Sequence, residues 1–279
     1  MVMPLSRVQA QAEAEAQAEA QVDAVKLLVH AAADRLLPVR RLLVLAGAGC
    51  SADAGIPTFR DDGGWWREYR PEDLATPEAF AQDPDLVWTW YRERRSQIRG
   101  AQPHGGQRSL ALLQKHFYDG QVLVATTNED DLLERAGIER VLHLHGSIFD
   151  TTCSAACGWP GGRDLNDSMA AHACPCCGAP TRPGSVWYGE ALPKGPLDEI
   201  HAFDPDGCLV IGSSSIVQPV AGIPTEMALA RLPVVEVNPH ATPLSDLALH
   251  LPGPAAQVLP ALVDLLTSAT MRDQRRRLS

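Results

Sequence analysis

Three groups of residues in this chain have types and spacings that suit chemistry, and the first is a glycine-rich loop. The segment "GAGCSA", residues 47–52, follows an apolar run and fits the G-x-G-x-x-[G/A] pattern of dinucleotide sites. In such sites the glycines bring the backbone close to a pyrophosphate at a helix N-terminus. The usual second strand with its acidic end is replaced by "PTFRDDGGWW". The pattern therefore predicts a nucleotide site and disfavours a hydride-transferring dehydrogenase.

The second group is a cluster of cysteines between Cys153 and Cys177. Cys153-x3-Cys157 and Cys174-x2-Cys177 form two close pairs. Four thiolates in two pairs predict a closed tetrahedral zinc site of the structural kind, with one zinc per chain. Cys176 competes with Cys174 or Cys177 for a ligand position, and the usual spacing followed by glycine favours Cys174 and Cys177. Unrelated free thiols are the alternative.

The third group consists of polar residues at the ends of two apolar runs. "LHLHGS" places His143 and His145 on the same face if the strand is regular. His145 has the better position for a general base near neutral pH, whereas a satisfied core or surface histidine is the alternative. "ATTNEDD" ends another run with Asn128 and Asp130. These either cap the following helix or bind ribose hydroxyls, a water or a carboxamide.

The elements that must position these residues are short apolar runs alternating with helical stretches. This alternation predicts an α/β fold with a Rossmann-like parallel sheet flanked by helices. The expected strands are residues 41–45, 122–125, 141–144, 208–211 and 233–237, each followed by a polar or glycine-rich turn. Because ligands bind at the carboxyl edge of such sheets, the five turns should converge on one crevice.

Two stretches interrupt the α/β pattern and are expected to form a small inserted helical and zinc-binding domain. They are residues 63–103, with a predicted helix in "DPDLVWTWYRERRSQIRG", and residues 149–185, which hold the cysteines. The Rossmann-like nucleotide-binding domain then takes residues 35–62, 104–148 and 186–268. Residues 1–30 are expected to be a helical or disordered extension, and residues 269–279 a basic tail.

Charge and hydropathy restrict the partners and the compartment. A net charge of −10 argues against direct binding to nucleic acid or an anionic membrane. No apolar run approaches the roughly 20 residues that span a bilayer. The N-terminus lacks the basic start and apolar core of a secretory signal, so a cytoplasmic protein is expected. The oligomeric state is not indicated.

Taken in order, the motifs resemble those of the sirtuin family of NAD-dependent protein deacylases. They are GAG-x-S, AGIP-x-FR, T-x-N-x-D, HG, paired cysteines, W-aromatic-GE, GSS and NP, from about Leu42 to near residue 265. The family breaks the bond from nicotinamide to ribose, which explains the Phe-Arg loop in place of a second strand. The resemblance implies NAD as co-substrate and acylated lysine in proteins as substrate. Nicotinamide, O-acyl-ADP-ribose and free lysine are the implied products.

The resemblance also assigns roles to individual residues. His145 would be the base that activates a ribose hydroxyl, and Asn128 would act beside it at the ribose and nicotinamide. The "VWYGE" segment would form the acyl-lysine channel, where the backbone of residues 186–188 (Val186, Trp187, Tyr188) pairs with the substrate peptide as an added strand. The implied NAD contacts are Gly47, Ala48, Gly49, Ser51, Phe59, Arg60, Asn128, Asp130, Gly212, Ser213, Ser214 and Asn238.

Acyl preference is suggested by Tyr91 and Arg94, which project from one face of the predicted helix at i and i+3. From spacing alone, the aromatic residues pack the small domain and the arginines are solvated. The resemblance implies otherwise, since the branch that removes succinyl and malonyl groups carries a Tyr-x-x-Arg pair on this helix. An Arg fork with a Tyr hydroxyl would hold an acyl carboxylate in an apolar channel. Desuccinylation is therefore expected to exceed deacetylation.

The chain departs from the family pattern at two places. Thr127 and Glu129 replace the Gln and the apolar residue of Thr-Gln-Asn-Ile-Asp, and Glu129 puts a charge beside the nicotinamide pocket. The first cysteine pair has three intervening residues where two are usual. Two alternatives to deacylation follow. One is ADP-ribosyl transfer or NAD hydrolysis, and the other is a non-catalytic NAD-sensing interaction module, which the two substitutions support.

Overall fold

A parallel sheet forms the centre of the molecule. The computed structural model describes residues 23–58, 69–117, 121–164 and 172–278. Six strands pair in the order β3-β2-β1-β7-β8-β9, each pair parallel. They are β1 (Leu42–Ala46), β2 (Val122–Thr126), β3 (Val141–His143), β7 (Gly207–Ile211), β8 (Val234–Asn238) and β9 (Leu249–Pro252). The predicted α/β class is confirmed.

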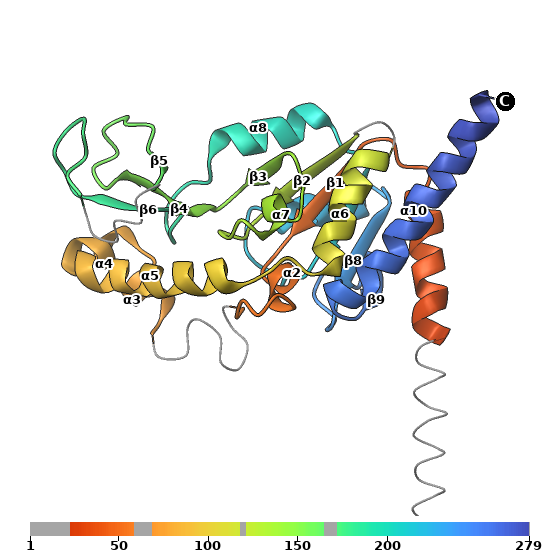
Figure 1. The fold of residues 1–279 in the computed structure, drawn as a ribbon, viewed down its shortest axis with the longest axis horizontal. Helices are drawn as coiled ribbons and strands as arrows, with labels where there is room; N and C mark the ends of the chain where they lie inside the picture. Colours follow the sequence, from red (N-terminus) through yellow and green to blue (C-terminus); the bar gives the residue numbers. More distant parts are fainter. Residues whose placement is uncertain (1–22, 59–68, 118–120, 165–171, 279) are drawn as a thin grey trace, which may run out of the picture.

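The sheet is covered by helices on both faces, which explains its continuous apolar strands. In β1, Leu42 and Val44 enter one hydrophobic core, while Leu43 and Leu45 enter the core on the opposite face. A helix over residues 23–36 lies on the first side with α6 (Gly105–His116) and α10 (Ala255–Leu278). The other side is packed by α8 (Lys194–Phe203), the teal helix at the top of Figure 1, and by α9 (Gly222–Leu229).

The five strands expected from the sequence are all present, and no boundary differs by more than one residue. The sixth, β9, escaped prediction because "LHLP" is only four residues long and three of them are half-buried. The α10 helix continues to Leu278, into the segment expected to be a basic tail. Within the described ranges, no helix combines the length and apolar character needed to cross a bilayer.

A smaller module lies at one end of the sheet, at the left of Figure 1. Its described residues form three helices and a three-stranded antiparallel sheet in the order β5-β4-β6. The elements are α3 (Pro71–Leu74), α4 (Pro77–Gln82), α5 (Pro84–Gly100), β4 (Gly146–Cys153), β5 (Gly162–Arg163) and β6 (Thr181–Ser185). Two one-turn helices, α2 (Gly49–Ala52) and α7 (Leu132–Arg135), follow β1 and β2.

The α5 helix is the predicted helix, and its start has a clear cause. Asp83 accepts a hydrogen bond from the Leu86 N–H at 2.9 Å, and Pro84 occupies the first helical position. Its aromatic residues pack the module, as their spacing indicates. Arg94 and Arg95 are not solvated, however, since only 3% and 1% of their surfaces are exposed. The solvated interpretation of these two arginines is therefore wrong.

Arg95 ties α5 to the small antiparallel sheet. Its Nε donates to the carbonyl of Ile148 at 2.6 Å, and its Nη1 lies 3.0 Å from Asp164 Oδ2. Its guanidinium also stacks 5.3 Å from the Trp88 ring centroid. A buried arginine with these partners satisfies its charge internally, and this fixes one side of α5 against β4. The neighbouring Arg94 points to a different environment, which forms part of the candidate site.

Candidate active site

A cavity of about 460 Å³ lies where the turns after β1, β2, β7 and β8 meet. The predicted convergence of these turns on one crevice is thus found. The cavity brings together residues from the glycine loop, from the turn after β2, from α5, from the segment after β6 and from the turns after β7 and β8. The predicted residues that line it are Gly47, Ala48, Gly49, Tyr91, Arg94, Asn128, His145, Val186, Trp187, Tyr188, Gly212, Ser213, Ser214 and Asn238.

The glycines of the first turn are required by close packing of two loops. A Cβ on Gly47 would lie 2.7 Å from the Ser213 Cα, and a Cβ on Gly49 would lie 2.8 Å from the Gly212 Cα. Gly212 itself has φ +58, which favours glycine. The backbone N–H of Gly49 donates to the Gly212 carbonyl at 2.9 Å. The two turns therefore form one continuous, glycine-rich wall that suits the close approach of a dinucleotide.

Asn128 lines the cavity and is held in place by several hydrogen bonds. Its Nδ2 donates to the Gly47 carbonyl at 3.0 Å and to Ser51 Oγ at 3.1 Å. Its backbone N–H donates to Thr126 Oγ1 at 2.9 Å. The side chain is buried, with 6% of the residue exposed. Asn128 thus joins the turns after β1 and β2 and presents its remaining amide oxygen in a fixed position.

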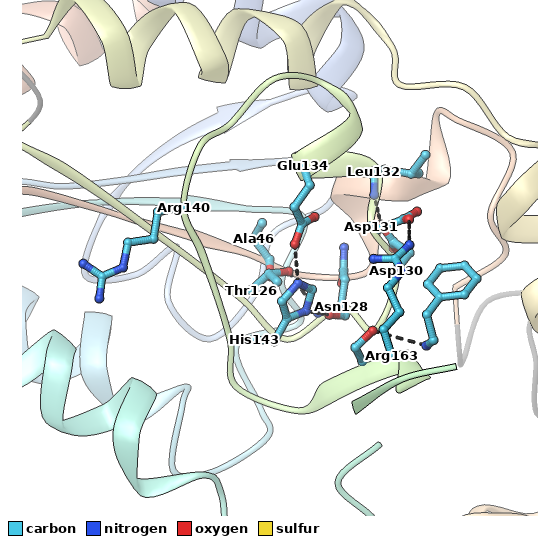
Figure 2. A network of polar contacts seen from close by, with 12 residues as sticks. Ala46, Thr126, Asn128, Asp130, Asp131, Leu132, Glu134, Arg140, His143 and Arg163 are labelled. Atoms are coloured by element: carbon cyan, nitrogen blue, oxygen red, sulfur yellow. Dashed lines mark hydrogen bonds and ion pairs between the residues drawn. The ribbon is translucent and has the colours of Figure 1, made fainter. Parts of the chain in front are cut away.

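Ser51 and Asp130 lie behind this wall and are not among the residues that line the cavity. Asp130 accepts a hydrogen bond from the Leu132 N–H at 3.1 Å, two residues along the chain (Figure 2). The N-cap residue of α7 is Asp131, whose side chain makes no cap bond, so the capping role considered for Asp130 is not found. Burial raises the pKa of the Asp130 carboxyl, although the bonds from Leu132 and Ser51 act in the opposite direction. Direct contact of Ser51 and Asp130 with NAD remains a prediction.

The two histidines of "LHLHGS" have different environments. The His143 ring bonds to the Asn128 carbonyl at 3.0 Å and to Glu134 Oε1 at 2.6 Å (Figure 2). Burial alone would lower its pKa, but the Glu134 bond and charge, together with the Asn128 carbonyl and the charge of Asp130, outweigh burial and raise the pKa. His143 is therefore a satisfied histidine that supports the Asn128 loop.

His145 lines the cavity and lies in the turn after β3. Burial lowers its pKa, and the charge of Glu129 together with a hydrogen bond to the Thr127 backbone only partly offsets this. The imidazole consequently remains neutral at neutral pH, the form that accepts a proton. Position and protonation state both suit a general base.

His104 is a site-supporting residue that the sequence analysis missed. Its Nε2 lies 2.8 Å from the Cys50 carbonyl in the glycine loop, and its Nδ1 accepts from the Gly106 N–H at 3.0 Å. Its backbone N–H donates to Gln107 Oε1 at 3.1 Å, which completes a capping box for α6. The sequence feature that could have indicated this role is the His-x-x-Gln spacing at the start of an amphipathic helix, which is typical of a capping box.

The far end of the cavity is organised by Asn238. Its Nδ2 donates to the Ser213 carbonyl at 2.8 Å, so that the turns after β7 and β8 are linked. Gly212, Ser213 and Ser214 line the cavity beside it. Phe59 and Arg60, the remaining predicted NAD contacts, lie outside the described residues.

The other wall of the cavity is aromatic and comes from α5 of the small module and from the segment that follows β6. The Trp187 Nε1 donates to the Tyr91 hydroxyl at 2.8 Å, and both side chains are buried. Burial raises the pKa of Tyr91, so that its hydroxyl stays protonated. Arg94, one turn further along α5, forms an ion pair with Glu129 from the turn after β2. Tyr91 and Arg94 therefore do line one channel, and Arg94 is paired inside the protein.

The "VWY" segment lies along this channel with its backbone donors in use. The N–H groups of Val186 and Tyr188 donate to the carbonyls of His145 at 2.8 Å and Ala75 at 3.0 Å. The N–H of Trp187 donates to Glu190 Oε2 at 2.8 Å. A substrate strand would therefore have to pair with the backbone carbonyl groups of this segment, and this pairing remains a prediction.

Four cysteines form a site that fits zinc. The Sγ atoms of Cys153, Cys157, Cys174 and Cys177 all lie within 4.8 Å of one another. The Cys153–Cys177 and Cys157–Cys174 sulfur distances are 3.5 and 3.7 Å. Tetrahedral zinc with bonds of about 2.3 Å separates its sulfurs by about 3.8 Å. Cys176 is exposed and lies outside the cluster, so the choice between the neighbouring cysteines falls on Cys177.

Comparison with known proteins agrees with this arrangement. A sequence model described as "Sir2 family" matches residues 47–219. The "NAD-dependent protein deacylase 1" of Pseudomonas aeruginosa is 43% identical over 247 residues, which cover 84% of this chain and 98% of that protein.

Two solved structures have the same fold. A Sir2 homologue in complex with NAD has a TM-score of 0.77 and 37% identity, with 85% of this chain and 93% of that chain covered. A Sir2 mutant with a deacetylated p53 peptide and 3′-O-acetyl ADP-ribose has a TM-score of 0.72 and 27% identity, with 83% and 96% covered.

Proposed function

Because the chain belongs to the Sir2 family and is an NAD-dependent protein deacylase, we propose that it removes succinyl and malonyl as well as acetyl groups from protein lysines. One observation carries the proposal: Tyr91 and Arg94 line the same cavity as His145. A lysine that reached His145 through this channel would place its acyl chain beside a tyrosine hydroxyl and a buried guanidinium.

Asn128 and His145, which both line the cavity, have different roles in the reaction. NAD supplies a ribose carbon that becomes open to attack by the acyl oxygen as nicotinamide leaves. Asn128 keeps one fixed amide oxygen at this point, because its Nδ2 is already bonded to Gly47 and Ser51. His145 takes a proton from a ribose hydroxyl, for which a neutral imidazole is needed. The deprotonated hydroxyl attacks the acyl carbon, the C–N bond to lysine breaks, and lysine leaves as a free amine after gaining a proton. A water molecule adds to the acyl carbon, so that the former acyl oxygen stays on the ribose carbon as a hydroxyl and O-acyl-ADP-ribose is the product.

Arg94 provides the recognition of an acidic acyl group. A carboxylate in a buried, largely apolar channel needs a paired cation, and a guanidinium offers two donors in one plane. Arg94 is 3% exposed and is held over the Trp90 ring, 4.6 Å from its centroid. Acetyl groups lack the carboxylate and do not use this contact. The channel also distinguishes deacylation from ADP-ribosyl transfer or NAD hydrolysis, which need only the NAD end of the cavity.

Replacing Arg94 with methionine is expected to lower the ratio of kcat/KM for succinyl-lysine to that for acetyl-lysine peptide by about 30-fold or more. Removing one partner of a buried charge pair costs about 2–5 kcal/mol, and each 1.36 kcal/mol is about tenfold. Both peptides are assayed on each variant by product release.

The matched control is Arg92→Met on the same helix, where the guanidinium bonds to Thr89 Oγ1 at 2.8 Å. This change should leave the ratio near its original value. Since Arg94→Met leaves the Glu129 carboxylate without its ion pair, melting temperatures are compared as well. An equal loss on both peptides would show that Arg94 supports the fold and does not recognise the acyl group.

A further inference from the structure

The pairing of Arg94 with Glu129 lies where an acidic acyl group would be recognised. Arg94 Nη2 donates to Glu129 Oε2, and the two side chains are 4% and 9% exposed. The two residues are 35 positions apart in the sequence and come from α5 and from the turn after β2. Both line the cavity that contains His145. An internal carboxylate therefore already holds the guanidinium.

Both partners are held in place from outside the pair. The guanidinium of Arg94 lies 4.6 Å from the Trp90 ring centroid and 5.2 Å from that of Tyr91. On the other side, the Glu129 carbonyl accepts from the Ile148 N–H at 3.0 Å, which anchors its backbone to β4. The adjacent Asn128 is fixed by its bonds to the glycine loop. The Glu129 carboxylate is thus directed at Arg94 by the fold and is not a mobile surface group.

We propose that Glu129 is a specificity-determining residue that competes with the acyl carboxylate of the substrate for Arg94. This inference rests on the proposed recognition of acidic acyl groups by Arg94. A succinyl or malonyl carboxylate entering the channel meets a second carboxylate on the same guanidinium, and two like charges in a buried site repel each other. An acetyl group meets no such repulsion. Glu129 therefore reduces the preference for acidic acyl groups below that expected from Tyr91 and Arg94 alone.

The test compares succinyl-lysine and acetyl-lysine versions of one peptide on the full-length chain carrying Glu129→Gln. Glutamine keeps the shape and can still accept a hydrogen bond from Arg94, but the negative charge is removed. We expect the ratio of kcat/KM for succinyl to that for acetyl to rise by about tenfold or more. The rise should disappear when Glu129→Gln is combined with Arg94→Met, because the guanidinium for which the two carboxylates compete is then absent.

Glu93→Gln is the matched control, since Glu93 is exposed on α5 next to Arg94 and the change in net charge is the same. An equal rise in this control would assign the effect to overall charge and overturn the proposal. An unchanged or lower ratio in Glu129→Gln would overturn it too. If Glu129→Gln melts at a much lower temperature, Glu129→Ile provides the second variant, with the same expected rise.

The same assays separate this inference from the proposed function. If the wild type and Glu129→Gln both desuccinylate with the same ratio, only the role of Glu129 fails. If every variant deacetylates but none removes succinyl, recognition by Arg94 fails and the role of Glu129 fails with it.

Discussion

Replacing His145 with alanine is expected to lower the turnover of deacylation by about 10²–10⁴-fold, the typical contribution of a positioned general base. The residue lines the cavity, and burial lowers its pKa so that the ring is neutral and can accept a proton. NAD should still bind, because the glycine loop and the turn after β7 do not depend on this ring. Turnover is measured with an acetyl-lysine peptide, and NAD binding by calorimetry.

The pH dependence provides a check on the same residue. A base works in its neutral form, and a pKa below 6.5 keeps His145 neutral above that pH. The wild-type kcat/KM should therefore stay level between about pH 7 and 8 and fall only below about pH 6.5. His201→Gln is the control, because His201 is exposed on α8 and lies outside the cavity lining. Wild-type turnover in His145→Ala would remove His145 from the mechanism.

Loss of a zinc ligand should have the other large effect. Cys174→Ser is expected to abolish zinc binding and to unfold the small module, since structural zinc sites supply folding energy directly. Cys174 is 2% exposed and lies with three other sulfurs in a closed cluster. Cys153 is the last residue of β4, and β4 pairs with β6 directly before Val186 in the acyl channel. Deacylation should therefore be lost together with the metal.

Zinc content is measured by mass spectrometry and folding by thermal melting with circular dichroism. Cys176→Ser is the matched control, because Cys176 is exposed and outside the cluster, and it should keep one zinc per chain. A Cys174→Ser variant that retains full zinc and a wild-type melting profile would contradict the structural role of this site.

Periodicity was sufficient to predict five strands of the six-stranded sheet, because these five are short, mainly apolar and followed by glycine-rich or polar turns. Leu42–Ala46 and Val122–Thr126 are buried along their whole length, which produces an unambiguous signal. β9 has no such run. The cysteine spacing likewise predicted a zinc site, while only the three-dimensional cluster decided between Cys176 and Cys177.

The ion pair of Arg94 with Glu129 could not be predicted in the same way. The sequence suggests a role for each residue separately: Arg94 for recognition of the acyl group, and Glu129 as a departure from the family pattern. Their contact depends on how α5 of the small module crosses the turn after β2 of the main sheet. Neither hydrophobic spacing nor a motif on one segment carries that information. The same holds for His104, whose contact with Cys50 joins segments 54 residues apart.

The most direct test of NAD-dependent deacylation is nicotinamide release by the full-length chain with NAD, measured with an acetyl-lysine peptide, with the unmodified peptide and with no peptide. Release of nicotinamide is expected only with the acylated peptide, in a 1:1 ratio with deacylated peptide and O-acetyl-ADP-ribose identified by mass spectrometry. Release at the same rate without acylated peptide would indicate an NAD hydrolase, and ADP-ribose attached to the peptide would indicate a transferase. NAD binding without any release of nicotinamide would contradict catalysis altogether.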